Sequence, residues 1–368
     1  MFRNKVALNV PGTVTTSRKK QLDNSSRTRK KKQLHIPTRE LAPPFPDGPC
    51  GGEIVTLEPS LTFDIDVRLS GNTMLLPPRP IRVWLPPGYN PNLKYPTLYC
   101  HDGQNAVSDA ESWTGRSWRL TGALTRLADH GFLEEKALPI VVLLPSMDGD
   151  LLPGIRRRHL EYGDVNIPFA QAHADFVALT VKPLVDARFP TNMDACYSIG
   201  SSLGGQAGMK RSRKCLLRRC MYGSYFENCA SCFSALHLNL RHADKFHGAA
   251  CLSPCFNPGI MASVAANGRK LLSSKKIYLD IGGDLGNQTV PFFDFWDHTT
   301  EKHAWNPGYF WLDTSLQPAV QSMCRLLDTA RVQYTYHEIP GGRHNERAWS
   351  MRIDKPLQYL LGKQSTEG

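Results

Sequence analysis

A serine flanked by glycines is the residue of this chain best suited to nucleophilic chemistry. Residues 200–205 are Gly-Ser-Ser-Leu-Gly-Gly, which places Ser202 in a G-x-S-x-G pattern directly after an apolar, strand-like segment. Glycines two residues either side of the serine permit a turn that is too tight for side chains and that lifts the hydroxyl above the sheet. We predict that Ser202 is a nucleophile and that the backbone N–H of Leu203 contacts the oxyanion, whereas Ser201 is out of register with the glycines.

A serine hydroxyl needs a base, and in this type of site the base is a histidine that follows the nucleophile in the chain. His344 fits best among the twelve histidines. It lies in a glycine-containing loop, residues 340–346 (PGGRHNE), between the last predicted strand and the last predicted helix. His337 falls inside that strand, where a structural role suits it better. We therefore predict that His344 is the general base.

The base requires an orienting carboxylate, and residues 276–284 (KIYLDIGGD) contain two. Asp280 lies within the predicted strand, whereas Asp284 lies just past its end, in a loop from which an acid can reach an imidazole. We predict Asp284 as the acid of the triad. Asp280 is the alternative, and holding loop amides is its other possible role.

A second oxyanion donor is expected in the loop that follows an earlier strand. Residues 101–105 (HDGQN) occupy that place, so we assign the donor to the backbone N–H of Gln104 or Gly103. Loss of one such donor usually costs about 2.7–4 kcal/mol of transition-state stabilisation. An ordinary Asp-Gly turn is the alternative interpretation of this segment.

The elements that must position these residues alternate between strands and helices. Apolar runs predict strands at 81–85, 97–100, 140–144, 195–199, 249–252, 276–281 and 333–338. Helical spacing predicts helices at 117–130, 169–185, 317–330 and 346–361. This order predicts an α/β fold with a mostly parallel sheet covered by helices on both faces, because continuously apolar strands are buried on both sides.

The charge of +11 is concentrated in two segments. Residues 1–50 carry a net charge of +8 and residues 210–220 a net charge of +6, which leaves −3 for the rest of the chain. A nucleic-acid-binding domain carries its basic surface on the folded body, so no nucleic-acid partner is expected. We predict that residues 1–50 form a disordered basic tail, dispensable for activity, and that the domain proper spans 51–363.

The compartment follows from what the sequence lacks. No apolar run reaches the length of a membrane span, and no secretory signal is visible. Ten cysteines are too few for a disulfide framework, so we expect free thiols in the cytoplasm. Organelle or nuclear targeting by the basic tail is the alternative. No cofactor is expected, and a zinc site in the cysteine-containing segment 215–232 is disfavoured by its neighbouring cations.

The order of these segments resembles the putative esterase family of α/β hydrolases, which includes enterochelin-esterase-like, feruloyl-esterase-like and esterase D-type proteins. The pieces that carry the resemblance span residues 79–361 and include RPIRVWLPPGYNPNLKYPTLYCHDGQN (79–105), SIGSSLGG (198–205), IYLDIGGD (277–284) and PGGRHNERAW (340–349). The resemblance implies ester hydrolysis through an acyl-enzyme, without metal or cofactor, and Ser202, Asp284 and His344 match the family's triad positions.

One segment departs from that pattern. Residues 209–233 bring six basic residues and four cysteines into the place of a continuous helix. Burying uncompensated cations beneath a sheet is prohibitive, so a genuine insertion must loop out, with a helix resuming near Ala235 to bury Leu236, Leu238 and Leu240. A gene-model artefact is the alternative.

The sequence thus predicts a serine esterase that acts on a small-molecule ester. Acyl transfer on the same fold and a non-catalytic binding protein are the alternatives. Aromatic residues near the predicted site, among them Trp113 and Trp118, suggest an aromatic cleft or ordinary core packing. Arg156, Arg157 and Arg158 either meet an anionic substrate or lie exposed without a specific role. Neither the ester nor the oligomeric state follows from the sequence.

Overall fold

An eight-stranded sheet forms the centre of the protein in the computed structural model, which describes residues 43–57, 64–65, 74–75, 79–133, 138–146, 150–152, 155–201, 231–285 and 308–362. The strand order is β1-β4-β6-β5-β9-β10-β11-β12. β1 and β4 pair antiparallel, as do β4 and β6, while the remaining pairs are parallel. The predicted mostly parallel sheet is therefore confirmed.

Seven of the eight strands of this sheet lie close to where the apolar runs predicted them, whereas β1 had not been predicted. The eight strands are β1 (Glu53–Thr56), β4 (Arg82–Leu85), β5 (Tyr95–His101), β6 (Ile140–Leu144), β9 (Thr191–Ser201), β10 (Gly248–Leu252), β11 (Lys276–Ile281) and β12 (Tyr334–Glu338). Two short pairs, β2 (Asp64–Ile65) with β3 (Met74–Leu75) and β7 (Asp150–Leu152) with β8 (Ile155–Arg156), stand apart from the sheet. Every residue of β6 and β10 is buried, as expected for strands covered on both faces.

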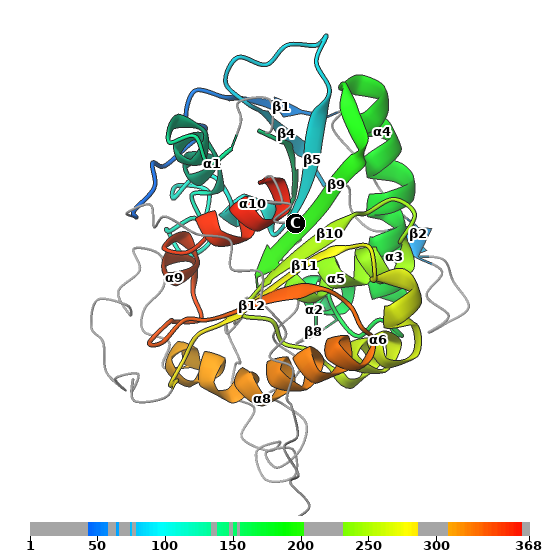
Figure 1. Ribbon diagram of the computed structural model, residues 1–368. Helices are drawn as coiled ribbons and strands as arrows, with labels where there is room; N and C mark the ends of the chain where they lie inside the picture. Colours follow the sequence, from blue (N-terminus) through cyan, green and yellow to red (C-terminus); the bar gives the residue numbers. More distant parts are fainter. Residues whose placement is uncertain are drawn as a thin grey trace, which may run out of the picture. The chain divides into compact units, whose positions relative to one another are not determined.

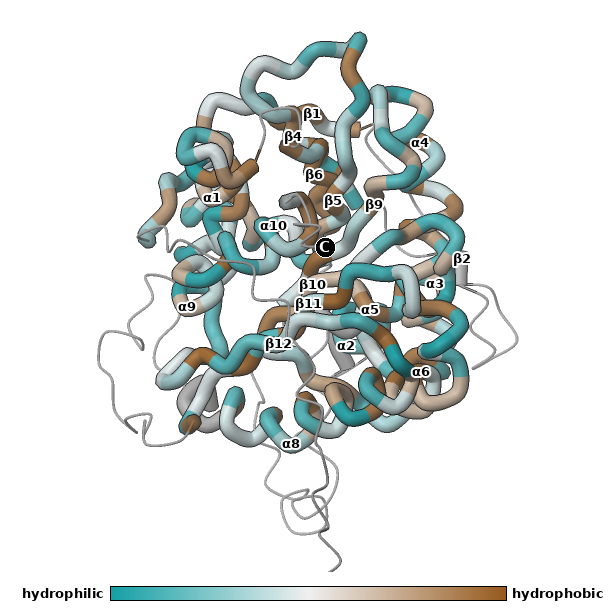
Figure 2. The backbone as a smooth tube through the Cα atoms, in the orientation of Figure 1, coloured by the Kyte–Doolittle hydropathy of each residue, from teal (hydrophilic) through white to brown (hydrophobic). Residues whose placement is uncertain are grey.

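Helices cover both faces of the sheet (Figure 1). One face carries α1 (Leu120–Asp129), α9 (Glu346–Ser350) and α10 (Asp354–Leu361), whose buried residues share a cluster with Trp84 and Val141. The other carries α2 (Arg157–Glu161), α3 (Pro168–Phe176), a π-helical turn (Val177–Val181), α4 (Lys182–Arg188), α5 (Ser231–Arg241), α6 (Pro258–Leu271) and α8 (Gly308–Thr329). The hydropathy of the residues agrees with these layers, because β4 and β6 are mainly apolar whereas α8 has both hydrophilic and hydrophobic residues along its length (Figure 2).

Helix α5 confirms one expectation about the basic insertion. It begins at Ser231 and buries Leu236, Leu238 and Leu240, as predicted for a helix that resumes near Ala235. The remainder of segment 209–233 lies outside the described residues. Helix α6 had not been predicted.

The start of the fold lies earlier than the sequence indicated. Phe45 is 2% exposed and packs in the cluster that contains Trp84 and Leu124. The carbonyl of Phe45 accepts a hydrogen bond from Arg119 Nη1 at 2.9 Å, and that of Gly48 accepts one from Thr121 Oγ1 at 2.6 Å. Residues 43–50 therefore belong to the folded domain and not to a dispensable tail. The rest of the expected tail lies outside the described residues.

We expect a chain that starts at residue 51 to be markedly less stable than one that starts at residue 43. Removing a buried phenylalanine usually costs about 3–5 kcal/mol, and the partners of residues 45–48 on α1 are lost as well. Urea unfolding of the two truncated chains and of the full chain measures the difference. Phe45→Ala in the full chain is the matched point variant. Equal unfolding midpoints for the two truncations would contradict this prediction.

Candidate active site

The carboxyl ends of the parallel strands bring those predicted site residues that the structure describes to one edge of the sheet, where ligands bind in open α/β sheets. β5 leads to Gly103 and Gln104, β9 ends at Ser201, and β12 leads to the loop that holds His344. Ser202 and Leu203 lie outside the described residues. The strand that the nucleophile turn requires is thus present, and it ends one residue before Ser202.

His344 pairs with Asp313, a residue that the sequence analysis did not consider. The two atoms His344 Nδ1 and Asp313 Oδ1 are 2.6 Å apart, and both side chains are fully buried. Asp284, the predicted acid, does not make this contact. Its backbone N–H donates to Thr314 Oγ1 at 2.9 Å, and its carbonyl accepts from Gln317 Nε2 at 3.0 Å, so the loop after β11 docks on α8. The assignment of Asp284 as the partner of His344 is therefore corrected to Asp313.

Asp313 lies on α8, which passes beside the end of β11. Its second oxygen, Oδ2, accepts hydrogen bonds from Ser253 Oγ at 3.0 Å and from the backbone N–H of Gly282 at 2.9 Å. Burial raises the pKa of this carboxyl, but the hydrogen bond and charge of His344, together with Arg352 and Ser253, lower it below its ordinary value. Asp313 is therefore held as an ionised acceptor for an imidazole.

Asp280 holds the backbone amide of Ser253, the serine that contacts Asp313, which agrees with the alternative role predicted for it. It accepts a hydrogen bond from the backbone N–H of Ser253 at 2.9 Å and from Arg352 Nε at 3.2 Å. Ser253 adopts φ = 46°, a left-handed conformation that costs energy for a residue with a side chain. Arg352 Nη2 also donates to Ser253 Oγ at 2.6 Å. Asp280 and Arg352 thus fix the serine that holds Asp313.

The second nitrogen of His344 is the one left for chemistry. Nδ1 is used by Asp313, whereas Nε2 is buried and makes no hydrogen bond to any residue that the structure describes. The ring packs against Trp349 in a T-shaped arrangement at a centroid distance of 5.2 Å. Asn345 caps helix α9 by accepting from the Ala348 N–H at 2.9 Å, which anchors the loop immediately after His344.

The predicted oxyanion donors, the backbone N–H groups of Gly103 and Gln104, lie in the turn after β5. Gly103–Asn105 forms a short 3-10 helix, and its turn bonds use the N–H groups of Asn105 and Ala106 rather than those of Gly103 and Gln104. A Cβ on Gly103 would lie 2.7 Å from the Leu143 backbone, so this position requires glycine. The Gln104 side chain is engaged away from its own backbone, donating to Ser146 Oγ at 2.7 Å.

Two of the three consecutive arginines are buried and paired with acids of this chain. Arg158 donates to both oxygens of Asp102, at 3.0 and 2.8 Å, and thereby fixes the residue before Gly103, which adopts φ = 55°. Arg157 forms an ion pair with Glu161, which also pairs with Arg79. Burial lowers the pKa of Arg158, yet the charge and hydrogen bond of Asp102 raise it overall. Arg158 therefore holds the turn after β5, and neither of the two arginines lies exposed.

The aromatic residues divide between core and site. Trp118 is fully buried in the core. Trp113 is partly exposed, and its Nε1 donates to Glu346 Oε1 at 2.9 Å. Because Trp113 also donates its backbone N–H to Asn105 Oδ1 at 3.2 Å, Trp113 links Glu346, at the end of the His344 loop, to the turn after β5.

Glu346 is a buried carboxyl that the sequence analysis missed. Burial raises its pKa from 4.5 to about 7, even though hydrogen bonds from its own backbone, Trp113 and Thr114 lower it. Its second oxygen, Oε2, has no hydrogen-bond partner among the described residues. A raised folded-state pKa makes the fold most stable below the unfolded value of 4.5, and that contribution is lost as the pH rises to about 7.

We expect Glu346→Gln to remove this loss. The variant should be more stable than the parent at pH 8 by up to about 3 kcal/mol, the free energy of a shift of this size, and the gap should narrow toward pH 4.5. Urea unfolding at pH 5, 6, 7 and 8 measures it. Glu53→Gln, at an exposed position of β1, is the control and should show no pH-dependent gain. A gap that does not change with pH would contradict the prediction.

The described part of the chain contains no group of three or more histidine, cysteine, aspartate or glutamate side chains arranged to hold a metal ion. None of the helices in those ranges combines the length and apolar character that crossing a membrane requires.

Comparison with known proteins agrees with this architecture. The sequence model of the family described as "Putative esterase" matches residues 74–214, a segment that contains the turn after β5 and Ser202. No curated protein matches the chain in sequence. The predicted resemblance to this family is confirmed over these residues, and the match supports carboxylic ester hydrolase activity.

Solved structures resemble the chain in fold. A ferulic acid esterase aligns with a TM-score of 0.51 and 16% identity, over 84% of this chain and 98% of that one. A feruloyl esterase module from Clostridium thermocellum complexed with sinapinate aligns with a TM-score of 0.51 and 17% identity, over 90% and 98%. The enterobactin esterase FES from Shigella flexneri aligns with a TM-score of 0.46 and 15% identity, over 82% and 59%. The first two matches confirm the α/β-hydrolase fold.

Proposed function

We propose that this carboxylic ester hydrolase cleaves its substrate through an acyl-enzyme, with Ser202 as nucleophile, His344 as base and Asp313 as the acid that orients the base. The observation that carries the proposal is the buried ion pair of Asp313 with His344. His344 Nε2 makes no hydrogen bond to the described residues and is therefore available to accept a proton. This pair lies at the carboxyl edge of the sheet, where β9 ends at Ser201, one residue before Ser202 in the chain.

The reaction follows from the roles of these groups. His344 Nε2 takes the proton of Ser202 Oγ as that oxygen attacks the ester carbonyl, and Asp313 stabilises the imidazolium that forms. Backbone N–H groups of Leu203 and of Gln104 or Gly103 hold the negative oxygen of the tetrahedral intermediate. The protonated His344 then delivers its proton to the leaving alkoxide, which departs as an alcohol. A water molecule, deprotonated in turn by His344, hydrolyses the acyl-serine and restores the enzyme.

Covalent labelling with a fluorophosphonate tests the identity of the nucleophile. We expect the probe to modify one serine, because only an activated hydroxyl reacts readily with it. Peptide mass spectrometry of the labelled chain should place the adduct on Ser202. Ser201→Ala is the matched control: Ser201 is fully buried at the end of β9, so this variant should still be labelled. An adduct on Ser201, or no adduct at all, would contradict the proposal.

A further inference from the structure

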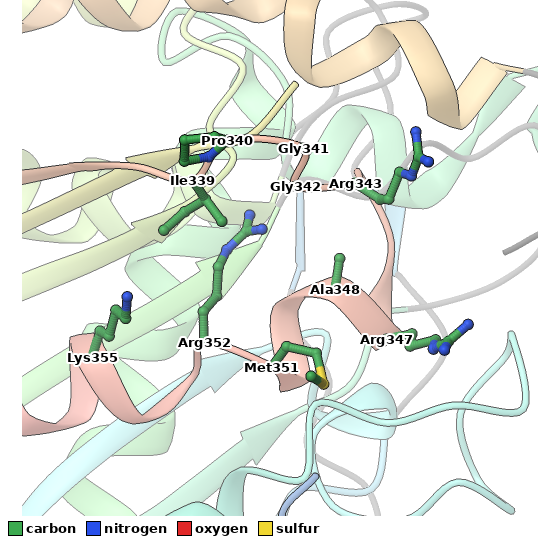
Figure 3. A pocket seen from close by; sticks show the side chains of 10 residues that line it. All are labelled: Ile339, Pro340, Gly341, Gly342, Arg343, Arg347, Ala348, Met351, Arg352 and Lys355. Carbon is green, nitrogen blue, oxygen red and sulfur yellow. The ribbon is translucent and has the colours of Figure 1, made fainter. Parts of the chain in front are cut away.

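A pocket lies behind the loop that carries His344 (Figure 3). It has a volume of about 530 Å³ and is bounded by the Ile339–Arg343 stretch of that loop, by α9 and by the start of α10. Among the described residues that line it, none is acidic and four are basic, namely Arg343, Arg347, Arg352 and Lys355. Such a concentration of positive charge favours a negatively charged occupant.

Arg352 gives the pocket a buried anchoring group. Its side chain is 3% exposed and rises toward the Ile339–Gly342 loop, with Lys355 and Arg347 on opposite sides of it (Figure 3). Nε and Nη2 bind Asp280 and Ser253, whereas Nη1 has no acceptor among the described residues. Leaving a buried charged donor without a partner is costly, so an acceptor supplied by a ligand would be stabilising.

Gly342 keeps space beside this nitrogen. A Cβ at that position would lie 3.1 Å from Arg352 Nη1, close enough to crowd it. The preceding residue, Gly341, adopts φ = 71°, which favours glycine as well. At Gly341 and Gly342 the loop therefore presents no side chain to the guanidinium of Arg352.

We propose that this pocket binds a small molecule through an oxyanion group, either a phosphate or a carboxylate. Both groups match the planar donor array of a guanidinium, and bonds between ionised partners are stronger than those between neutral ones. The site is separate from the proposed ester site, because it is lined by the back of the His344 loop and not by the oxyanion turn. The proposed anion binding does not depend on the proposed hydrolytic reaction.

Titration calorimetry of the full chain with inorganic pyrophosphate and, separately, with citrate tests the proposal. We expect saturable binding of one equivalent of at least one of them, and the tighter ligand identifies the oxyanion class. Arg347→Gln and Lys355→Gln should each weaken that binding about tenfold, as expected for loss of one charge-assisted hydrogen bond. Neither residue belongs to the proposed triad or its supports.

The control is Arg269→Gln with Lys270→Gln, two exposed cations of α6 that should leave binding unchanged. Melting temperatures establish that each variant is folded. If combining Arg347→Gln with Lys355→Gln prevents folding, the two single variants are sufficient for the test. Absence of saturable binding of either anion would overturn the proposal. So would binding that survives loss of Arg347 and Lys355, because the anion would then reside elsewhere, such as on the basic segments 1–50 or 210–220.

Discussion

Replacing Ser202 by alanine should lower kcat for ester hydrolysis by about 10⁶-fold, the loss typical of removing the nucleophile of a serine hydrolase. His344→Ala should cost about as much, because a serine without its base is a poor nucleophile at neutral pH. The combined variant should be little worse than either single variant, since the residues of a triad act as a unit. Initial rates on p-nitrophenyl acetate measure all three.

Stability must be followed beside activity in these variants. Ser202→Ala is expected to melt like the parent, so a lost activity cannot be ascribed to unfolding. Ser201→Ala is the matched control, because it removes a neighbouring hydroxyl that is out of register with the two glycines, and it should retain turnover. Normal hydrolysis by Ser202→Ala would refute the proposed nucleophile, while strictly additive losses in the combined variant would argue against a coupled pair.

Asp313→Asn should lower kcat about 10⁴-fold, the effect of an aspartate-to-asparagine change that leaves geometry intact and reverses the imidazole tautomer. The amide can donate to His344 Nδ1, which moves the imidazole proton to Nε2, the nitrogen that must accept from Ser202. KM should change little, since Asp313 is fully buried and lies behind the histidine. Steady-state measurements of kcat and KM distinguish a loss confined to kcat from a general loss of structure.

Asp284→Asn is the control that separates the two acids. Because the interactions of its backbone N–H and carbonyl with α8 survive the substitution, turnover should stay within a few-fold of the parent. Asp280→Asn should mainly reduce stability, because it removes the negative partner of buried Arg352. A crippled Asp284→Asn beside an active Asp313→Asn would restore the acid predicted from the sequence.

Local patterns in the sequence were enough to predict most of the sheet and the loop positions of two candidate site residues. Apolar runs located β6 and β11 to the residue, because strands buried on both faces carry an uninterrupted apolar signal. The loop position of His344 followed from its place between a strand and a helix. Gly103 was identified for a similar reason, since turns between elements have recognisable composition.

Tertiary structure alone decided which carboxylate serves His344. Asp284 satisfied the local rule for a strand end, but Asp313, on helix α8, is the carboxylate that contacts His344. The two residues are distant in sequence, so no periodic pattern predicts their contact. Phe45 and Arg158 illustrate the same limit. A segment with tail-like composition packs on α1, and an arginine expected at the surface is buried against Asp102. Charge and composition describe a residue's own tendency, whereas burial depends on the partner that folding places opposite it.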